Sequence, residues 1–206
     1  MLAPENLSMG RINGAVRQRG FTLLEMMIAL LIFGVGLLQV AALQAVAKRA
    51  NYEAIQRTTA SHLAFDMLER MRANSNAVDG YPGLLGERIL GGGTRGAEPA
   101  PDCNSAADGC SSSDLAVHDL WEWEQRLDGA TEVSAGVSTG GLISPTACIR
   151  GPAGGGAGVY TTAIAWRGVS ELTDPTADAC GDASGLYGAN NEFRRILVIQ
   201  TFIGPF

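Results

Sequence analysis

The feature that most constrains this chain is an uncharged apolar run from Met26 to Ala47. At 1.5 Å of helix rise per residue, a run of about 22 residues spans roughly 33 Å, close to the hydrocarbon thickness of a bilayer. A secretory signal peptide would have a shorter apolar core followed by a small-residue cleavage site. Here the run leads directly into further helical sequence. It therefore predicts a membrane anchor over residues 21–47.

A single acid, Glu25, directly precedes this run, behind a leader that contains Arg17 and Arg19. A carboxylate at the edge of a hydrophobic span is costly unless it is paired, and such acids are usually functional. Gly20 would let a membrane-embedded protease approach the backbone, and cleavage there would free the amine of Phe21. Staggered neighbouring helices could then pair the acid of one subunit with the amine of another. The alternative is an ordinary signal anchor with an incidental glutamate.

The charges and the cysteines indicate on which side of the membrane the chain beyond the anchor lies. The leader arginines favour a cytoplasmic N-terminus, although Lys48 and Arg49 weaken that bias. The chain has four cysteines, all beyond the anchor: Cys103, Cys110, Cys148 and Cys180. An even number of cysteines in a glycine-rich domain favours disulfides in an oxidising compartment, with three pairings open. A zinc site of four thiolates is disfavoured because no Cys-x-x-Cys pair is present.

Composition and motifs exclude several classes of function. The net charge is −6, and losing the three arginines and one glutamate of the first twenty residues would make it about −8. This acidity argues against nucleic acid as a partner. His62 and His118 have no ligand set near them in the sequence, and the glycine runs lack the context of a phosphate loop. No arrangement typical of an active site is present, so we expect no catalytic residue, metal or other cofactor.

The helical pattern continues beyond the anchor. Apolar residues at spacings of three and four predict one helix from about Phe21 to about Asn74, amphipathic over residues 48–74. A second helix is predicted from an N-cap among residues 112–114 to about Leu127. Trp121 and Trp123 fall on different sides of this helix, so we expect one in the core and one exposed.

Strand signals follow the second helix. Residues 131–137 are a weak candidate, and residues 142–150 are a second candidate that contains Pro145. Residues 159–166 and 193–203 are rich in β-branched and aromatic side chains, which predicts two central antiparallel partners. The long loop between them contains Cys180 and needs a tether.

The junction Arg19-Gly20-Phe21-Thr22-Leu23-Leu24-Glu25 resembles the class III signal of type IV prepilins and type II secretion pseudopilins. The resemblance implies that a prepilin peptidase cleaves after Gly20 and N-methylates Phe21. It further implies that Glu25 and Thr22 take part in subunit docking. Major pilins usually carry a proline partway along this helix, near Ala42 here, and this chain has none, which favours a minor pilin or pseudopilin.

Further segments resemble PilV-type minor pilins: Leu43-Gln44-Ala45, residues 64–74, Asp119-Leu120-Trp121-Glu122-Trp123, Gly185-Leu186-Tyr187-Gly188 and Arg194-Arg195. On proximity along the chain and on this resemblance, we favour the pairings Cys103 with Cys110 and Cys148 with Cys180. The expected fold is α+β and type IV pilin-like: a long N-terminal helix with a transmembrane first half, packed on a small antiparallel sheet with an extra helix and disulfide-tethered loops.

The expected organisation is a cleaved leader (1–20), a transmembrane assembly helix (21–47), its amphipathic continuation (48–74) and a periplasmic domain (75–206). The resemblance implies a minor pilin that helps to initiate pilus assembly from the inner membrane and then lies in the fibre, at its tip. The implied partners are other minor pilins, the major pilin, prepilin peptidase, the inner membrane, the assembly platform and a tip adhesin. The alternatives are a pseudopilin of type II secretion and a tip module that binds DNA or a host surface.

Overall fold

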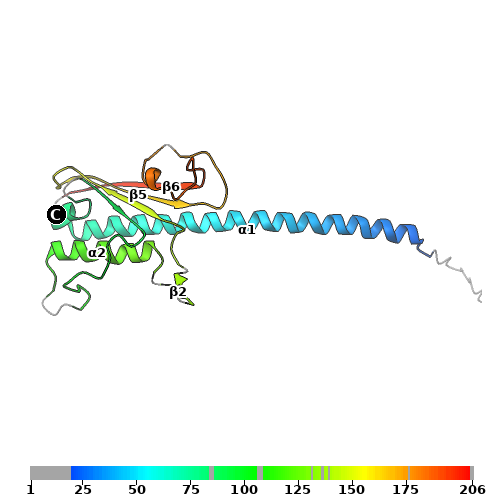
Figure 1. The fold of residues 1–206 in the computed structure, drawn as a ribbon, viewed down its shortest axis with the longest axis horizontal. Coiled ribbons are helices and arrows are strands. Elements are labelled where there is room, and N and C mark those ends of the chain that lie inside the picture. The colour runs from blue at the N-terminus through cyan, green and yellow to red at the C-terminus, as the bar shows by residue number, and fades with distance from the viewer. Residues whose placement is uncertain are drawn as a thin grey trace, which may run out of the picture. The chain divides into compact units, whose positions relative to one another are not determined.

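The structure is a computed structural model that describes residues 20–83, 86–105, 109–130, 132–135, 137–138, 140–175 and 177–204. Of the expected leader, only Gly20 lies within the described residues. The chain divides into two compact units, Met1–Val46 and Ala47–Phe206. The described part of the first unit is the start of one helix, and the second unit contains the sheet (Figure 1).

Helix α1 (Leu23–Ala73) is a single α-helix of 51 residues, slightly shorter at both ends than predicted. Its start is set by Thr22, because the Glu25 N–H donates a hydrogen bond to the Thr22 hydroxyl (3.3 Å). This contact is that of an N-cap residue with the third residue of its helix. The helix ends at Ala73. The backbone angles of Asn74 are not helical, and the 3-10 helix η1 (Ser75–Gly80) follows it.

The second unit contains a four-stranded antiparallel sheet in the order β1–β4–β5–β6. Its strands are β1 (Glu87–Leu90), β4 (Thr146–Arg150), β5 (Gly158–Arg167) and β6 (Arg194–Ile203). The predicted pairing of β5 with β6 is confirmed over the whole length of both strands. The prediction that both are central is wrong for β6, which lies at the edge of the sheet.

Three strand predictions need correction. Strand β1 is absent from the sequence prediction, since Glu87-Arg88-Ile89-Leu90 is short and half charged; pairing with β4 makes it a strand. The candidate over residues 142–150 begins only at Thr146, after Pro145, which has no N–H for a ladder. The candidate over residues 131–137 is instead a pair of two-residue strands, β2 (Val133–Ser134) and β3 (Val137–Ser138).

Helix α2 (Ser112–Leu127) ends where the sequence predicts, but its N-cap is one residue earlier. The Ser111 hydroxyl accepts a hydrogen bond from the Asp114 N–H (3.2 Å) and donates to the Asp114 carboxylate (2.6 Å). This reciprocal pair satisfies an otherwise unpaired helix-end donor and places an acid in the first turn. Ser111 therefore fixes where α2 starts.

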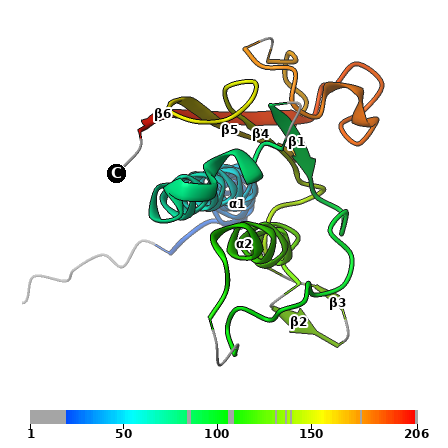
Figure 2. The ribbon, with the colours of Figure 1, turned by 90° about the vertical axis from the view of Figure 1, so that its left-hand side faces the viewer.

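The second unit has three layers, with residues 47–73 of α1 between the sheet and α2 (Figure 2). Alternate residues of the strands face α1, as the period of two requires. The main core joins side chains of all three layers: Leu63, Met67, Leu68 and Met71 of α1, Leu120, Trp123 and Leu127 of α2, Ala147 and Ile149 of β4, and Tyr160, Ile164 and Trp166 of β5. The amphipathic half of α1 is thus the centre of the domain.

The opposite face of the sheet carries a smaller buried cluster. Cys148 of β4, Ala163 of β5 and Cys180 of the β5–β6 connection form it, with Ile196 and Val198 of β6 packed against it. The connection between β5 and β6 contributes Cys180 to this cluster, so the long loop covers part of the outer face. Strand β5 is consequently buried on both faces.

Candidate functional site

The junction before α1 lies at the surface of the first unit. Gly20 and Phe21 precede the helix, Thr22 caps it, and Glu25 lies in its first turn. Phe21 is 80% exposed, and its side chain has no packing role among the described residues of this unit. A protease that approached the chain here would meet an accessible backbone rather than a folded core.

Gly20 is not required by the fold. A Cβ atom added at Gly20 would meet no atom within 4 Å, and the same holds for Gly34 and Gly36 in the helix. Gly20 is also not among the glycines of positive φ, so its backbone conformation is open to other residues. Packing and backbone strain therefore give no reason for a glycine at this position.

Glu25 is the only formal charge between Thr22 and Ala47. Its side chain forms no hydrogen bond or ion pair with the described residues, and only its backbone contacts Thr22. Ile28, Ala29 and Ile32 lie on the same face of the helix, one and two turns further on. The acid thus stands at the edge of an apolar face without a partner among the described residues.

The first half of α1 has the length and composition of a membrane span. It is the one helix of that kind among the described residues, and no side chain of its apolar part is buried. A helix that is apolar on all sides needs lipid or other apolar helices around it. This part of the chain therefore fits membrane anchoring, as the sequence predicts.

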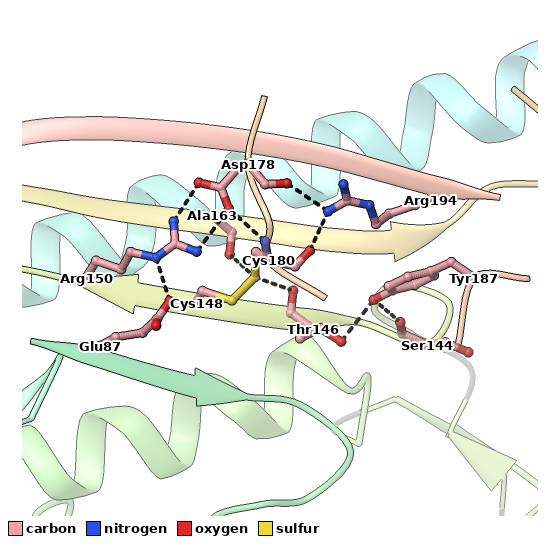
Figure 3. The surroundings of a disulfide bond; sticks show 10 residues. All are labelled: Glu87, Ser144, Thr146, Cys148, Arg150, Ala163, Asp178, Cys180, Tyr187 and Arg194. Carbon is pink, nitrogen blue, oxygen red and sulfur yellow. Dashed lines mark hydrogen bonds and ion pairs between the residues drawn. A yellow bond between two sulfur atoms is a disulfide. The ribbon is translucent and has the colours of Figure 1, made fainter. Parts of the chain in front are cut away.

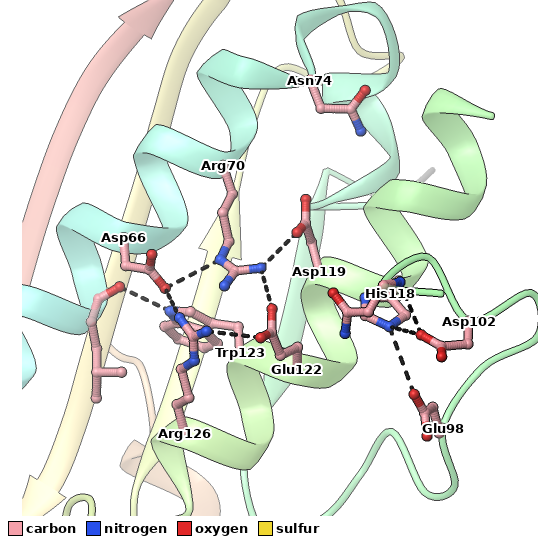
Figure 4. A network of polar contacts seen from close by, with 12 residues as sticks. Asp66, Arg70, Asn74, Glu98, Asp102, His118, Asp119, Glu122, Trp123 and Arg126 are labelled. Carbon is pink, nitrogen blue, oxygen red and sulfur yellow. Dashed lines mark hydrogen bonds and ion pairs between the residues drawn. The ribbon is translucent and has the colours of Figure 1, made fainter. Parts of the chain in front are cut away.

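A polar network fastens α1 to α2 in the second unit (Figure 4). The Arg70 guanidinium contacts Asp119 (2.6 Å) and Glu122 (2.8 Å) of α2 and Asp66 of its own helix (3.2 Å). Burial acts to lower the pKa of Arg70, but these carboxylates outweigh it and raise the pKa. Arg70 therefore stays charged and bridges the two helices.

Tyr81, the residue that follows η1, extends this network. Its hydroxyl donates to Asp119 Oδ2 (2.5 Å), and the side chain is fully buried. Burial, together with that hydrogen bond, raises the pKa of Tyr81. The tyrosine remains neutral and a donor, so that Asp119 is held by both Tyr81 and Arg70.

Two disulfides involve all four cysteines. Cys103 is bonded to Cys110, which closes a short loop, and Cys148 of β4 is bonded to Cys180 of the β5–β6 connection. The second bond lies in the smaller cluster on the outer face of the sheet (Figure 3). It supplies the tether that the length of this loop requires.

An ion pair lies beside this disulfide. Arg150 of β4 donates to both carboxylate oxygens of Asp178 (2.6 and 3.0 Å) and to Glu87 of β1 (2.6 Å). Asp178 also accepts from the Cys180 N–H (2.8 Å). Burial alone would raise the pKa of Asp178, but these bonds and the arginine charges outweigh burial and lower it. Asp178 thus fixes the loop next to Cys180.

Arg194 fastens the same loop from β6. Its side chain is 2% exposed and donates to the carbonyl oxygens of Asp178 (2.8 Å), Cys180 (2.8 Å) and Pro175 (2.6 Å), and to the Asp174 carboxylate (2.7 Å). These bonds satisfy backbone acceptors that a buried loop would otherwise leave unpaired. The sequence marks this residue only as part of the Arg194-Arg195 doublet, and no local spacing identifies the carbonyls that it binds.

Of the two tryptophans of α2, one lies in the core as predicted, and the other is only partly exposed. Trp123 is fully buried, and its indole N–H donates to the Leu63 carbonyl of α1 (2.9 Å). Trp121 is partly exposed, and its N–H donates to the Gly96 carbonyl (3.2 Å). Trp121 therefore holds the segment after β1 rather than standing free for a partner.

His118 has no ligand set near it in the sequence, and the sequence therefore predicts none around it. This prediction is wrong, because the fold places two carboxylates beside His118. His118 is buried, and its Nε2 lies 3.4 Å from Asp102 Oδ1 and 3.8 Å from Glu98 Oε1 (Figure 4). Both acids come from the segment between β1 and α2, far from His118 in the sequence. His62 is exposed on α1. The chain fold, rather than local spacing, brings the acids to His118.

The fold has a long N-terminal apolar helix packed, in its second half, on a four-stranded antiparallel sheet with an extra helix and two disulfides. This is the arrangement of the type IV pilin fold. Two family models agree: the one described as type IV pilin Tt1218 matches residues 38–121, and the prokaryotic N-terminal methylation motif matches residues 16–38. The chain is therefore a type IV pilin-like protein with an N-terminal methylation motif.

The methylation motif implies that the chain is a substrate of prepilin peptidase with pilus assembly partners. Type IV pilins are structural proteins rather than enzymes. Comparison with curated proteins and with solved structures gave no match.

Proposed function

We propose that this protein is a minor pilin that helps to initiate type IV pilus assembly. The observation that carries the proposal is the junction at Gly20, which combines a glycine that the fold does not need, an exposed Phe21 and an unpartnered Glu25 ahead of a membrane-length helix. Packing among the described residues explains none of these features. All three are explained together by cleavage and subunit docking.

Cleavage after Gly20 would give Phe21 a free amine. In a membrane, such an amine and the Glu25 carboxylate are each costly to desolvate alone. The amine of Phe21 and the carboxylate of Glu25 lie at the same end of one helix, because Glu25 is in the first turn of α1. Axially staggered neighbours would place the acid of one subunit against the amine of another, so that the charges compensate each other as the helices pack.

The domain fits an extracytoplasmic location. Both disulfides and the whole sheet belong to the unit that follows the apolar part of α1. Disulfides persist in oxidising compartments such as the periplasm. We therefore place residues 21–47 in the inner membrane before assembly, with the domain from residue 75 onward in the periplasm and later in the fibre.

A role as a minor subunit is supported by the helix itself. Proline does not occur anywhere in α1, whereas the resemblance leads one to expect it partway along the helix of a major pilin. A small priming complex with other minor pilins, at the fibre tip, is the role that we infer, with the assembly platform and the major pilin as further partners. A pseudopilin of type II secretion has the same junction and is the second candidate.

The proposal is tested by complementing a deletion strain with Gly20→Ala and Glu25→Ala. Gly20→Ala is expected to leave uncleaved precursor in the membrane, and Glu25→Ala to give processed protein with few or no surface pili. The matched controls are Gly34→Ala, a glycine equally free of contacts, and Gln39→Ala, a polar residue of the same apolar helix. Both controls are expected to restore piliation.

Two results would count against the proposal. Normal piliation by both junction variants would remove the assembly mechanism. Normal piliation in the deletion strain itself, accompanied by loss of exoprotein secretion, would favour the pseudopilin.

A further inference from the structure

His118 offers a buried ring nitrogen with no partner. The side chain is 3% exposed, and Nε2 makes no hydrogen bond with the described residues. Asp102 Oδ1 and Glu98 Oε1 are its closest acceptors, at 3.4 and 3.8 Å, but neither is in hydrogen-bonding geometry. A buried nitrogen left unsatisfied costs free energy unless something else binds it.

The three side chains have the spacing of metal ligands. One ligand atom from each of Glu98, Asp102 and His118 lies within 4.8 Å of the other two. Ligands at about 2.0–2.1 Å from a tetrahedral ion lie roughly 3.3 Å from one another, close to the two distances from Nε2. We propose that these residues form a binding site for a divalent cation of the zinc type.

The chemistry of the donors selects the class of cation. One imidazole and two carboxylates suit zinc and its neighbours, whereas calcium and magnesium prefer oxygen ligands alone. Two carboxylates with a neutral histidine also balance the charge of a divalent ion. All four cysteines are in disulfides, so no thiol competes for the ion. A fourth position stays open to water, because the carboxylates are 48% and 40% exposed on the side chain.

Hydrogen bonds from its neighbours orient the Asp102 carboxylate beside His118. Asp102 accepts hydrogen bonds from the Asn104 N–H (2.9 Å) and the Ser105 hydroxyl (2.5 Å), which fix the orientation of its carboxylate. Such contacts to a ligand are typical of metal sites, where they set its direction. The adjacent residue, Cys103, is held by its disulfide to Cys110.

The start of the same segment is anchored to α2. The fully buried Glu124 carboxylate accepts from the N–H groups of Gly91 (2.7 Å), Thr94 (3.0 Å) and Arg95 (2.7 Å). The Trp121 indole then holds the Gly96 carbonyl. Glu98 and Asp102 therefore lie between two fixed points, and a bound ion would fasten the middle of this segment to α2.

The test uses the full chain in detergent, without a histidine tag, titrated with zinc by calorimetry and with cobalt(II) by visible absorption. We expect one ion per chain and the absorption of low-symmetry, four-coordinate cobalt. His118→Asn should weaken zinc binding by more than about 100-fold, since even the loss of an outer-shell partner costs about 10–100-fold. His62→Asn is the matched control, because this substitution removes the other histidine, which is exposed. The His62→Asn variant should bind zinc as tightly as the unchanged chain does.

The Glu98→Gln/Asp102→Asn double variant keeps the test decisive if His118→Asn fails to fold. Both acids are partly exposed, so this change spares the core while removing two ligands. Loss of stoichiometric binding in this variant, with binding kept in His62→Asn, supports the site. Absence of one-equivalent binding in the unchanged chain, or equal weakening by His62→Asn, would overturn it.

Discussion

At the level of single residues, two threonines on neighbouring strands differ in the hydrogen bonding of their hydroxyl groups. Thr146 of β4 accepts a hydrogen bond from the buried Tyr187 hydroxyl (2.9 Å). Thr162 of β5 is fully buried, and its hydroxyl has no hydrogen-bond partner among the described residues. A partnered buried hydroxyl contributes to stability, whereas an unpartnered one costs its desolvation.

This contrast predicts opposite effects of one substitution. Thr162→Val should leave the free energy of unfolding unchanged or raise it by about 1 kcal/mol, because valine has a similar shape and no buried hydroxyl. Thr146→Val should lower the free energy of unfolding by about 1 kcal/mol, because the buried Tyr187 hydroxyl loses its bond to Thr146 and keeps only its bond to the Ser144 carbonyl (3.0 Å). Denaturant unfolding followed by tryptophan fluorescence measures both. Equal destabilisation by the two variants would contradict the burial argument.

At the scale of elements, the β5–β6 connection is held to the sheet by three separate means. These are the Cys148–Cys180 disulfide, the Arg150–Asp178 ion pair and the bonds of Arg194 to the loop carbonyls. A long loop that covers one face of a sheet needs such partners, since its buried backbone groups have no ladder to join. The described part of this connection, which includes the 3-10 helix η2 (Asp182–Ser184), therefore covers part of the outer face of the sheet without an α-helix.

The ion pair predicts a dependence of stability on pH. The folded state lowers the pKa of Asp178, so its contribution is complete above the unfolded pKa of about 3.9 and is lost as pH falls through the folded value. Asp178→Asn should lower the free energy of unfolding by about 1–3 kcal/mol at neutral pH. The difference from the unchanged chain should shrink as the pH falls below about 4.

The matched control is Glu87→Gln, which removes the other carboxylate bound to Arg150. Glu87 is 47% exposed, so its effect should stay within about 0.5 kcal/mol. Unfolding curves at neutral pH and at several acidic values, with the disulfides kept intact, provide the measurement. A destabilisation by Asp178→Asn that did not change with pH would show that the ion pair is not its cause.

Elements could be predicted from the sequence where the pattern is local and long. The periodicity of α1 and α2 and the β-branched runs of β5 and β6 predict these four elements with small errors at the ends. Strand β1 could not be predicted, because Glu87–Leu90 becomes a strand only by pairing with residues far away in the sequence. The edge position of β6 likewise depends on strand order, which residue preferences do not determine.

At the scale of the whole molecule, the two units have different surroundings to satisfy. The described part of the first unit is exposed and apolar around its circumference, with one acid at its start. The second buries a core of its own around the amphipathic half of α1. This division suits a subunit that is held in a membrane by one half of its helix and presents a folded domain with the other.

The two sites differ in how far the sequence could indicate them. The junction is contiguous, so the sequence alone is enough to group Gly20, Phe21, Thr22 and Glu25 as one candidate site. The cluster at His118 is assembled from two segments whose approach depends on Glu124, Trp121 and a disulfide. Its residues have no recognisable spacing in the sequence, and burial of the unpaired nitrogen is visible only in the fold.

We propose that the chain is cut after Gly20 and enters a surface fibre as a pilin. This proposal is tested most directly by mass spectrometry of the N-terminal peptide from pili sheared off the native cells. A pilin processed in this way gives a peptide that begins at Phe21 and carries one additional methyl group on its amine. Recovery of the chain only from membranes, with its N-terminus still upstream of Phe21, would contradict it.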